Sequence, residues 1–215
     1  MKQSLTADHR KNLDELISKT EKRTQTQIVL AVIERSDSYI ELPWKAFAFG
    51  ASITGILVVI FNFLMNTWHS QIPTWIGITL TLAGGALGAL LAAFIPKFAK
   101  LFLSRDRAEV EVEQYAQSLF LEREIFATKN RTGILFMISL FERKIVILPD
   151  TGLHKQLPEQ TLKTIIATMA PHLKRRNIDQ ALAAGLEKLS QMLGESVKGS
   201  SENELQDTII EEKGV

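Results

Sequence analysis

Two long segments of this chain contain no aspartate, glutamate, lysine or arginine. They run from residue 46 to 65 and from residue 73 to 95, and only a short polar stretch separates them. A run of about 20 apolar residues matches the roughly 30 Å hydrocarbon core of a bilayer, and a helix satisfies its own backbone hydrogen bonds there. The sequence therefore predicts a transmembrane helical hairpin over residues 45–100. A buried hairpin in a soluble protein is the alternative, but the rest of a 215-residue chain could hardly cover two such helices.

Basic residues flank the two apolar runs and are absent between them. Lys45 precedes the first run, and the second run is followed by Lys97, Lys100, Arg105 and Arg107. The connecting residues 66–72 contain no lysine or arginine. By the positive-inside rule, both flanks face the cytoplasm and the connection faces the far side. We therefore expect an integral membrane protein of the bacterial inner-membrane type, with both termini and the remaining domain in the cytoplasm.

Small residues recur at helical spacing in the second apolar run. Gly84, Gly88 and Ala92 form one stripe, and such stripes let helix backbones approach closely in lipid. The stripe can form a homodimer interface through the second span, or it can pack against the first span, which offers Ala51 and Gly55. We favour packing within the chain and keep the homodimer as the alternative.

The composition excludes several classes of chemistry. The chain has 0 cysteines, which excludes disulfides, thiolate catalysis and cysteine-based zinc sites. Its formal net charge of +1 gives no indication of a nucleic-acid partner. The polar N-terminus lacks the apolar segment of a cleavable signal peptide, so we expect insertion to depend on the hairpin. No GxSxG, Walker-type or dinucleotide-binding motif is present.

Short apolar runs outside the hairpin predict strands. Residues 27–33, 134–140 and 145–148 are continuous apolar stretches, each too short to cross a membrane. Such runs are typical of strands that are buried on both faces. Phe141-Glu142-Arg143 is short enough for a hairpin turn, so the last two strands are expected to pair antiparallel.

Helical periodicity accounts for most of the remaining segments. We expect helices that begin near Thr6, run from Arg105 to Phe126, begin at Leu157-Pro158, and run from Asn177 or Asp179 to Gly194. The element order is then helix, strand, membrane hairpin, helix, strand, strand, helix, helix. Because the first strand has no partner before the hairpin, segments on both sides of it must build one α/β domain.

These expectations divide the chain into four parts. Residues 1–44 and 101–193 form the two halves of one α/β domain with a small mixed sheet, and residues 45–100 form the transmembrane hairpin. Residues 194–215 are a polar tail that is low in aromatic residues, which predicts disorder. Within this tail, residues 205–210 are a candidate for a short docking helix.

A longer pattern in the second half of the chain resembles a known family. It comprises a turn with Gly133, an apolar strand over 134–140, a basic turn at Arg143, a strand over 145–148, Gly152-Leu153-His154, and a helix opened by Leu157-Pro158. Residues 25–32 resemble the opening strand of that family, and residues 171–177 and 181–186 resemble its closing helix. On these segments the chain resembles the TPM domain family, in a membrane-anchored form with a two-helix insertion.

The resemblance implies an α/β/α sandwich of the TPM type that is interrupted by the hairpin. It implies no single activity, since some relatives are described as acid phosphatases or metal binders and others as assembly or modulatory factors for membrane complexes. In relatives thought to bind metal, acidic residues occur where this chain has Asn130-Arg131. Arg131 would repel a cation, so we expect no metal ion and no cofactor.

The candidate site residues lie around one predicted strand end. The four histidines show no HxxxH or HExxH spacing, but His154 follows Asp150 at the end of a strand, where open sheets place ligands. Asp150 and His154 are the candidate catalytic residues, and Asp150 could pair with His154 or Arg143. The candidate binding residues are Arg143, Asp150, Thr151, Gly152 and His154. In the competing interpretation, Asp150 only binds the backbone of its own turn.

Anchoring without a recognisable catalytic set favours a binding function. We expect an integral membrane protein whose cytoplasmic TPM-like domain binds a protein partner in or at the membrane, as an assembly or modulatory factor. The alternative is a membrane-tethered, phosphatase-like hydrolase with its site near the turn from Asp150 to His154. Lys174-Arg175-Arg176 can in addition contact anionic headgroups, or can simply end a solvated helix.

Overall fold

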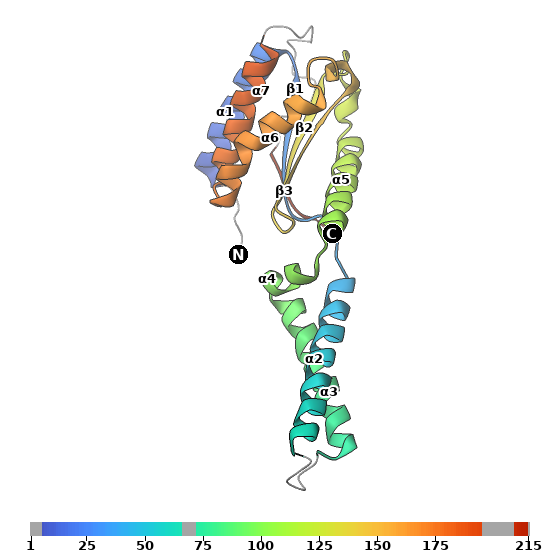
Figure 1. Cartoon of the computed structure of the whole chain (residues 1–215). Coiled ribbons are helices and arrows are strands. Elements are labelled where there is room, and N and C mark those ends of the chain that lie inside the picture. Colours follow the sequence, from blue (N-terminus) through green and yellow to red (C-terminus); the bar gives the residue numbers. More distant parts are fainter. Residues whose placement is uncertain (1–5, 66–71, 195–208, 215) are drawn as a thin grey trace. The chain divides into compact units, whose positions relative to one another are not determined.

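The computed structural model describes residues 6–65, 72–194 and 209–214 and divides into two compact units (Figure 1). The first unit consists of Met1–Asp37 and Glu109–Val215, and we call it the α/β unit. The second unit is Ser38–Ala108, which we call the hairpin unit. The chain thus leaves the α/β unit after its first strand and re-enters it within a helix.

A four-stranded mixed sheet forms the centre of the α/β unit. Its order is β3-β2-β1-β4, with β1 parallel to both β2 and β4, and β2 antiparallel to β3. The strands are β1 (Gln27–Arg35), β2 (Gly133–Ser139), β3 (Lys144–Pro149) and β4 (Ile209–Gly214). The three strands predicted from apolar runs are therefore present, and the predicted antiparallel hairpin joins β2 to β3.

Helices cover both faces of this sheet. One face packs against α1 (Ala7–Thr24), α6 (Glu159–Lys174) and α7 (Ile178–Leu193), and the other packs against α5 (Arg105–Glu122), as Figure 1 shows. Two short 3-10 helices, η3 (Ile125–Ala127) and η4 (Thr151–Leu153), lie in the connections. The predicted α/β/α sandwich with a small mixed sheet is confirmed.

The apolar run of β1 explains why the sheet has a core on each face. Ile28, Leu30 and Val32 contribute to the core under α1, α6 and α7. Val29, Ala31 and Ile33 alternate with them and contribute to the core under α5. Because side chains alternate between the two faces of a strand, only a continuous apolar run can fill both cores.

The C-terminal segment departs from the sequence prediction. Residues 209–214 are not disordered and not helical, because they form β4 and pair with β1 in parallel register from Leu30↔Ile209 to Arg35↔Gly214. Ile209 and Ile210 are each 8% exposed and contribute to opposite cores. Two apolar residues at the edge of a sheet can therefore order a segment that is otherwise polar. The predicted tail residues 195–208 and 215 lie outside the described residues.

Charged side chains tie β4 to the helices on both faces. Arg10 Nη2 of α1 lies 2.9 Å from Glu211 Oε1, and Arg123 Nη2 lies 2.6 Å from Glu212 Oε1. Tyr115 Oη donates to Glu212 Oε2 at 3.0 Å. Two effects together raise the pKa of Tyr115 to about 12. Partial burial is the larger effect, and this hydrogen bond to a carboxylate is the second.

We expect Tyr115 to retain its proton well above the ordinary tyrosine pKa of 10.0. Between pH 10 and about 12 the unfolded chain loses this proton while the folded chain keeps it, so the free energy of unfolding falls as pH rises. Tyr39→Phe leaves Tyr115 as the sole tyrosine, and phenolate absorbance then reports its pKa directly. Adding Glu212→Gln to the Tyr39→Phe variant should lower the pKa of Tyr115. If Tyr115 titrated near pH 10 with and without Glu212→Gln, the contact between Tyr115 and Glu212 would be contradicted.

The hairpin unit contains two long apolar helices. α2 (Glu41–Met65) and α3 (Thr74–Phe94) are each long and apolar enough to cross a membrane. No residue in the apolar window of α2 is buried, and only 17% of the window of α3 is buried. The helix α3 ends before Pro96, where the short helix α4 (Pro96–Ala99) begins, and the 3-10 helix η2 (Lys100–Phe102) follows.

The two apolar helices pack closely because glycines line their contact. A Cβ atom on Gly84 would meet the side chain of Thr54, and one on Gly88 would lie 2.5 Å from the carbonyl oxygen of Ala46. Asn62 Oδ1 also accepts a hydrogen bond from the Ile72 backbone at 2.8 Å, which joins the ends of the two helices. Gly84 and Gly88 of the predicted stripe thus lie against α2 within one chain. Residues 66–71, which include Trp68 and His69, lie outside the described residues.

Candidate functional site

The turn of residues 150–154, which carries most of the predicted site residues and which we call the site turn, is joined to the loop that precedes β2. Because β2 and β3 pair antiparallel, with Ile134 opposite Pro149, the residues before β2 lie beside those after β3. The backbone N–H of Asp150 donates to Gly133 O at 2.8 Å, and that of Gly152 donates to Arg131 O at 3.0 Å. A Cβ atom on Gly152 would collide with the carbonyl oxygens of Asn130 and Arg131, so this position requires glycine.

Asp150 is buried between its own turn and Arg131. Its side chain is 3% exposed, and Oδ1 accepts a hydrogen bond from the Thr151 backbone at 2.7 Å, which caps η4. Oδ2 lies 2.9 Å from Arg131 Nε, although this N–H is not aligned for a hydrogen bond. The distance and the charges define an ion pair. Asp150 therefore stabilises the turn, as the competing sequence interpretation proposed.

The other predicted site residues do not assemble around Asp150. Its ion pair is with Arg131, and neither His154 nor Arg143 contacts it, so the suggested pairings are wrong. Arg143 lies at the opposite end of β3, a strand of about 20 Å. His154 is exposed, and its side chain makes no hydrogen bond or ion pair with the residues that the structure describes. Asp150, Thr151 and Gly152 are brought together only by their shared turn.

A metal centre has little support in this turn. Across residues 6–65, 72–194 and 209–214, no group of three or more histidine, aspartate or glutamate side chains is arranged to hold a metal ion. The one buried carboxylate of the turn already faces the guanidinium of Arg131. A cation there would have to displace that charge.

Sequence reasoning missed a cluster of polar side chains, Ser36, Ser139 and Glu142, at the other end of the sheet. Glu142, in the turn between β2 and β3, accepts hydrogen bonds from the Ser36 backbone at 3.0 Å and from the Ser36 hydroxyl at 2.7 Å. The Ser139 hydroxyl donates to the second oxygen of Glu142. These contacts hold the chain where it leaves β1, so the cluster has a positioning role. Its signal in the sequence is weak, because Ser36 and Glu142 are 106 positions apart.

We expect Arg131→Gln to destabilise the protein more than Asp150→Asn does. The first change leaves a buried carboxylate without its counter-ion, which costs about 2–3 kcal/mol after allowance for the half-exposed arginine. The second change leaves a neutral side chain in the same turn and should cost about 1 kcal/mol. Denaturant unfolding of both variants measures the difference, and His154→Gln, which should change stability by less than about 0.5 kcal/mol, is the control. A larger loss in Asp150→Asn would contradict the ion-pair account.

The most unusual surface of the described chain belongs to the hairpin unit. Large apolar side chains point outward along both helices and no protein covers them; examples are Val59 at 67% exposure, Phe63 at 80% and Phe94 at 79%. A soluble protein rarely exposes a continuous apolar surface that extends along two long helices. The chain thus combines an α/β/α sandwich with two helices of membrane-spanning length and composition.

Comparison with known proteins agrees with this architecture. Residues 99–192 match the family model of the TPM domain. A similar solved structure is the NMR structure of BA42 protein from the psychrophilic bacterium Bizionia argentinensis sp. nov.. It is 16% identical, with a TM-score of 0.58, and the match covers 98% of this chain and 97% of that chain. No curated protein matches the chain.

The comparisons confirm the predicted resemblance and the predicted fold class. The family match covers α5, β2, β3, α6 and nearly all of α7. At 16% identity, the structural match supports the fold alone and assigns no activity to the turn around Asp150.

Proposed function

We propose that this protein is an integral membrane protein whose α2–α3 hairpin spans the bilayer and whose TPM domain binds a protein partner at the membrane. The observation that carries the proposal is the uncovered apolar surface of the hairpin unit. None of the apolar window of α2 is buried, whereas the core helix of a soluble protein is mostly buried. Lipid is the solvent that such a surface requires.

The distribution of basic residues supports a cytoplasmic TPM domain. Lys97 and Lys100 follow α3, and Arg105 and Arg107 begin α5, whereas residues 66–72 contain no lysine or arginine. Under the positive-inside rule, the chain on both sides of the hairpin stays in the cytoplasm.

A binding role fits the predicted site turn better than a hydrolase does. Asp150 is held by Arg131 and by its own turn, and His154 has no orienting partner among the described residues. A general base needs a second group that fixes its orientation and its tautomer. The turn therefore offers a rigid surface rather than a catalytic pair.

The proposal is tested by crosslinking in intact membranes, followed by mild detergent extraction and affinity purification of the tagged chain. We expect one membrane-associated protein to co-purify at a constant ratio. Residues 38–108 fused to an unrelated soluble domain are the control, and this fusion should not retain the partner. Repeated isolation of the chain alone would contradict a partner-binding role. Hydrolysis of phosphate esters that is lost in His154→Ala would favour the hydrolase.

A further inference from the structure

The charged residues of the hairpin unit are confined to one of its two ends. Between residues 46 and 96 the chain contains no aspartate, glutamate, lysine or arginine. The helices α2 and α3 are antiparallel, since Gly84 lies against Thr54 and Gly88 lies against Ala46. Residues 38–45 and 97–108 therefore lie at the same end, which we call the hairpin base. Its basic residues are Lys45, Lys97, Lys100, Arg105 and Arg107.

Three cations of the hairpin base have no counter-ion within the described chain. Lys45, Lys97 and Arg105 are exposed, and none of them forms an ion pair with a described residue. Arg107 differs, because its Nε lies 3.8 Å from Glu41 Oε1. The base contains only one further carboxylate in its sequence, so it keeps a net positive charge.

Large apolar side chains are exposed among these cations. They include Trp44, Ile95 and Leu101. The backbone of Ile95 is not helical, with φ at −117° and ψ at 94°, so α4 leaves the axis of α3 (Figure 1). The ring of Phe102 then packs against that of Phe49 on α2, with the centroids 5.6 Å apart. This contact holds α4 and η2 beside α2, so cations and apolar side chains share one surface at the hairpin base.

The length of α2 brings the hairpin base to the lipid headgroups when the hairpin spans a bilayer. The 25 residues of α2 form a helix about 37 Å long, and the hydrocarbon core is about 30 Å thick. About five residues must therefore extend beyond the core. Because the uncharged run starts at residue 46, these are residues 41–45. Trp44 and Lys45 then lie at the membrane–water interface, where tryptophan and lysine side chains are favoured.

We propose that the hairpin base binds the headgroups of anionic phospholipids through Lys45, Lys97 and Arg105. This inference rests on the proposed spanning hairpin and adds a preference among lipids. Each lysine or arginine near an anionic membrane surface strengthens the attraction by about fivefold, and a zwitterionic headgroup carries no net charge to attract it. Residues 66–72, at the opposite end of the hairpin, contain no lysine or arginine. The preference is therefore confined to the leaflet at the hairpin base.

Two tryptophans report the two ends of the hairpin separately. Trp44 lies at the hairpin base and Trp75 in the first turn of α3, and each is 70% exposed. Of the 3 tryptophans in the chain, Trp68→Phe with Trp75→Phe leaves Trp44 alone, and Trp44→Phe with Trp68→Phe leaves Trp75 alone. Each full-length variant is reconstituted in bilayers of phosphatidylcholine and phosphatidylglycerol, with the same composition in both leaflets.

The measurement is the quenching of tryptophan fluorescence when one of the two lipids is brominated near the headgroup end of its acyl chains. We expect phosphatidylglycerol to be favoured over phosphatidylcholine by about threefold or more next to Trp44. Next to Trp75 the ratio of the two binding constants should be about 1, because this end carries no lysine or arginine. Added salt should lower the ratio at Trp44.

Neutralising the three cations tests their role directly. With Lys45→Gln, Lys97→Gln and Arg105→Gln combined, the ratio at Trp44 should fall below about 1.5. Quenching by phosphatidylcholine should remain, which shows that the altered hairpin still lies in the bilayer.

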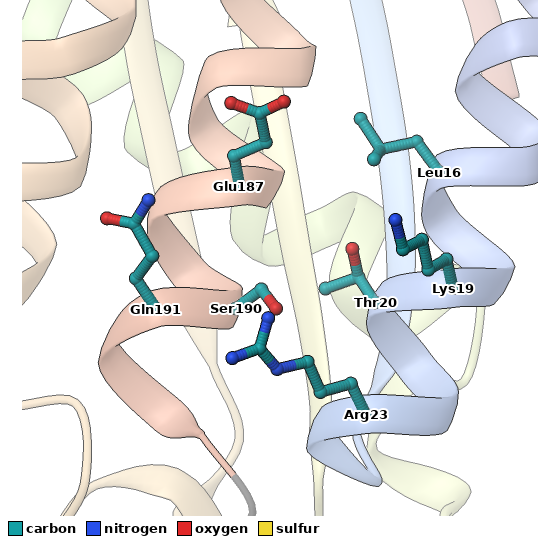
Figure 2. Close-up of a pocket in the computed structure, with 7 residues that line it drawn as sticks. All are labelled: Leu16, Lys19, Thr20, Arg23, Glu187, Ser190 and Gln191. Carbon is teal, nitrogen blue, oxygen red and sulfur yellow. The ribbon is translucent and has the colours of Figure 1, made fainter.

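The matched control removes three cations from the α/β unit. Figure 2 shows Lys19 and Arg23 on α1 across a groove from Glu187 on α7, so cations there share their surface with a carboxylate. Lys19→Gln, Lys22→Gln and Arg23→Gln combined change the net charge by the same amount and should leave the ratio at Trp44 unchanged.

The outcomes distinguish this inference from the spanning hairpin on which it rests. Equal quenching by both lipids at Trp44 would overturn the lipid preference while leaving the hairpin in the bilayer. An equal preference at Trp44 and Trp75, or an equal loss in the two triple variants, would also overturn it, because the attraction would then belong to the whole chain. If neither lipid quenched either tryptophan, the hairpin would lie outside the bilayer and both proposals would fail.

Discussion

Removal of residues 209–215 is expected to destabilise the α/β unit by about 3–6 kcal/mol and to promote aggregation. Ile209 and Ile210 are 8% exposed, and full burial of an isoleucine contributes about 1.5–3 kcal/mol. The truncation also removes the ion pairs of Glu211 with Arg10 and of Glu212 with Arg123. A loss of this size is a large fraction of the 5–15 kcal/mol that a typical domain has in total.

The aggregation follows from the position of β1 in the sheet. Without β4, the apolar residues 28–33 of β1 would form an edge with free backbone groups, and such edges pair with other chains. Denaturant unfolding and light scattering of the truncated chain in detergent measure both effects. Lys213→Ala is the control, because this exposed side chain should contribute less than about 0.5 kcal/mol. Unchanged stability and solubility after truncation would show that β4 is not part of the fold.

Gly88→Leu is expected to separate α2 from α3. A Cβ atom at this position would lie 2.5 Å from the Ala46 carbonyl oxygen and 3.2 Å from its carbonyl carbon, so backbone rather than a flexible side chain stands in the way. Overpacking of this kind costs about 1–3 kcal/mol, and a leucine adds more volume than a single methyl group. We expect the largest effect of any single substitution in the hairpin unit.

Ala86→Leu is the matched control for this substitution. It lies one half-turn away on the exposed face of α3, where an added leucine side chain meets solvent or lipid instead of α2. Unfolding in a detergent titration should show a lowered midpoint for Gly88→Leu and a midpoint near that of the parent chain for Ala86→Leu. If both substitutions lowered the midpoint equally, the stripe would face another molecule rather than α2.

The elements that the sequence predicted correctly are those with a strong local signal. A run of about 20 residues without charge defines each hairpin helix, and continuous apolar runs define β1, β2 and β3. Segment β4 lacked such a signal, because Ile-Ile-Glu-Glu-Lys-Gly contains three charges and only two large apolar residues. Its order comes from pairing with a strand about 180 positions earlier, which no local pattern records.

The candidate site shows the same limit in its side-chain contacts. Asp150 was identified from its place after a strand, but its partner was not. The pairing with Arg131 follows from the register of β2 and β3, which places the residue two before Gly133 beside the turn after Pro149. The antiparallel pairing of β2 with β3 was predicted correctly. The register of that pairing, which brings Arg131 beside Asp150, could not be predicted from the residue types.

Membrane insertion of the hairpin is tested most directly by single-cysteine labelling, since the chain has 0 cysteines of its own. Thr74→Cys places a thiol at the start of α3, and Lys163→Cys places one on the exposed face of α6, where the side chain is 64% exposed. With a membrane-impermeant maleimide, we predict labelling of Thr74→Cys in intact spheroplasts and labelling of Lys163→Cys only after disruption. Protection of both thiols until lysis, together with release of the chain by alkaline carbonate, would contradict a spanning hairpin.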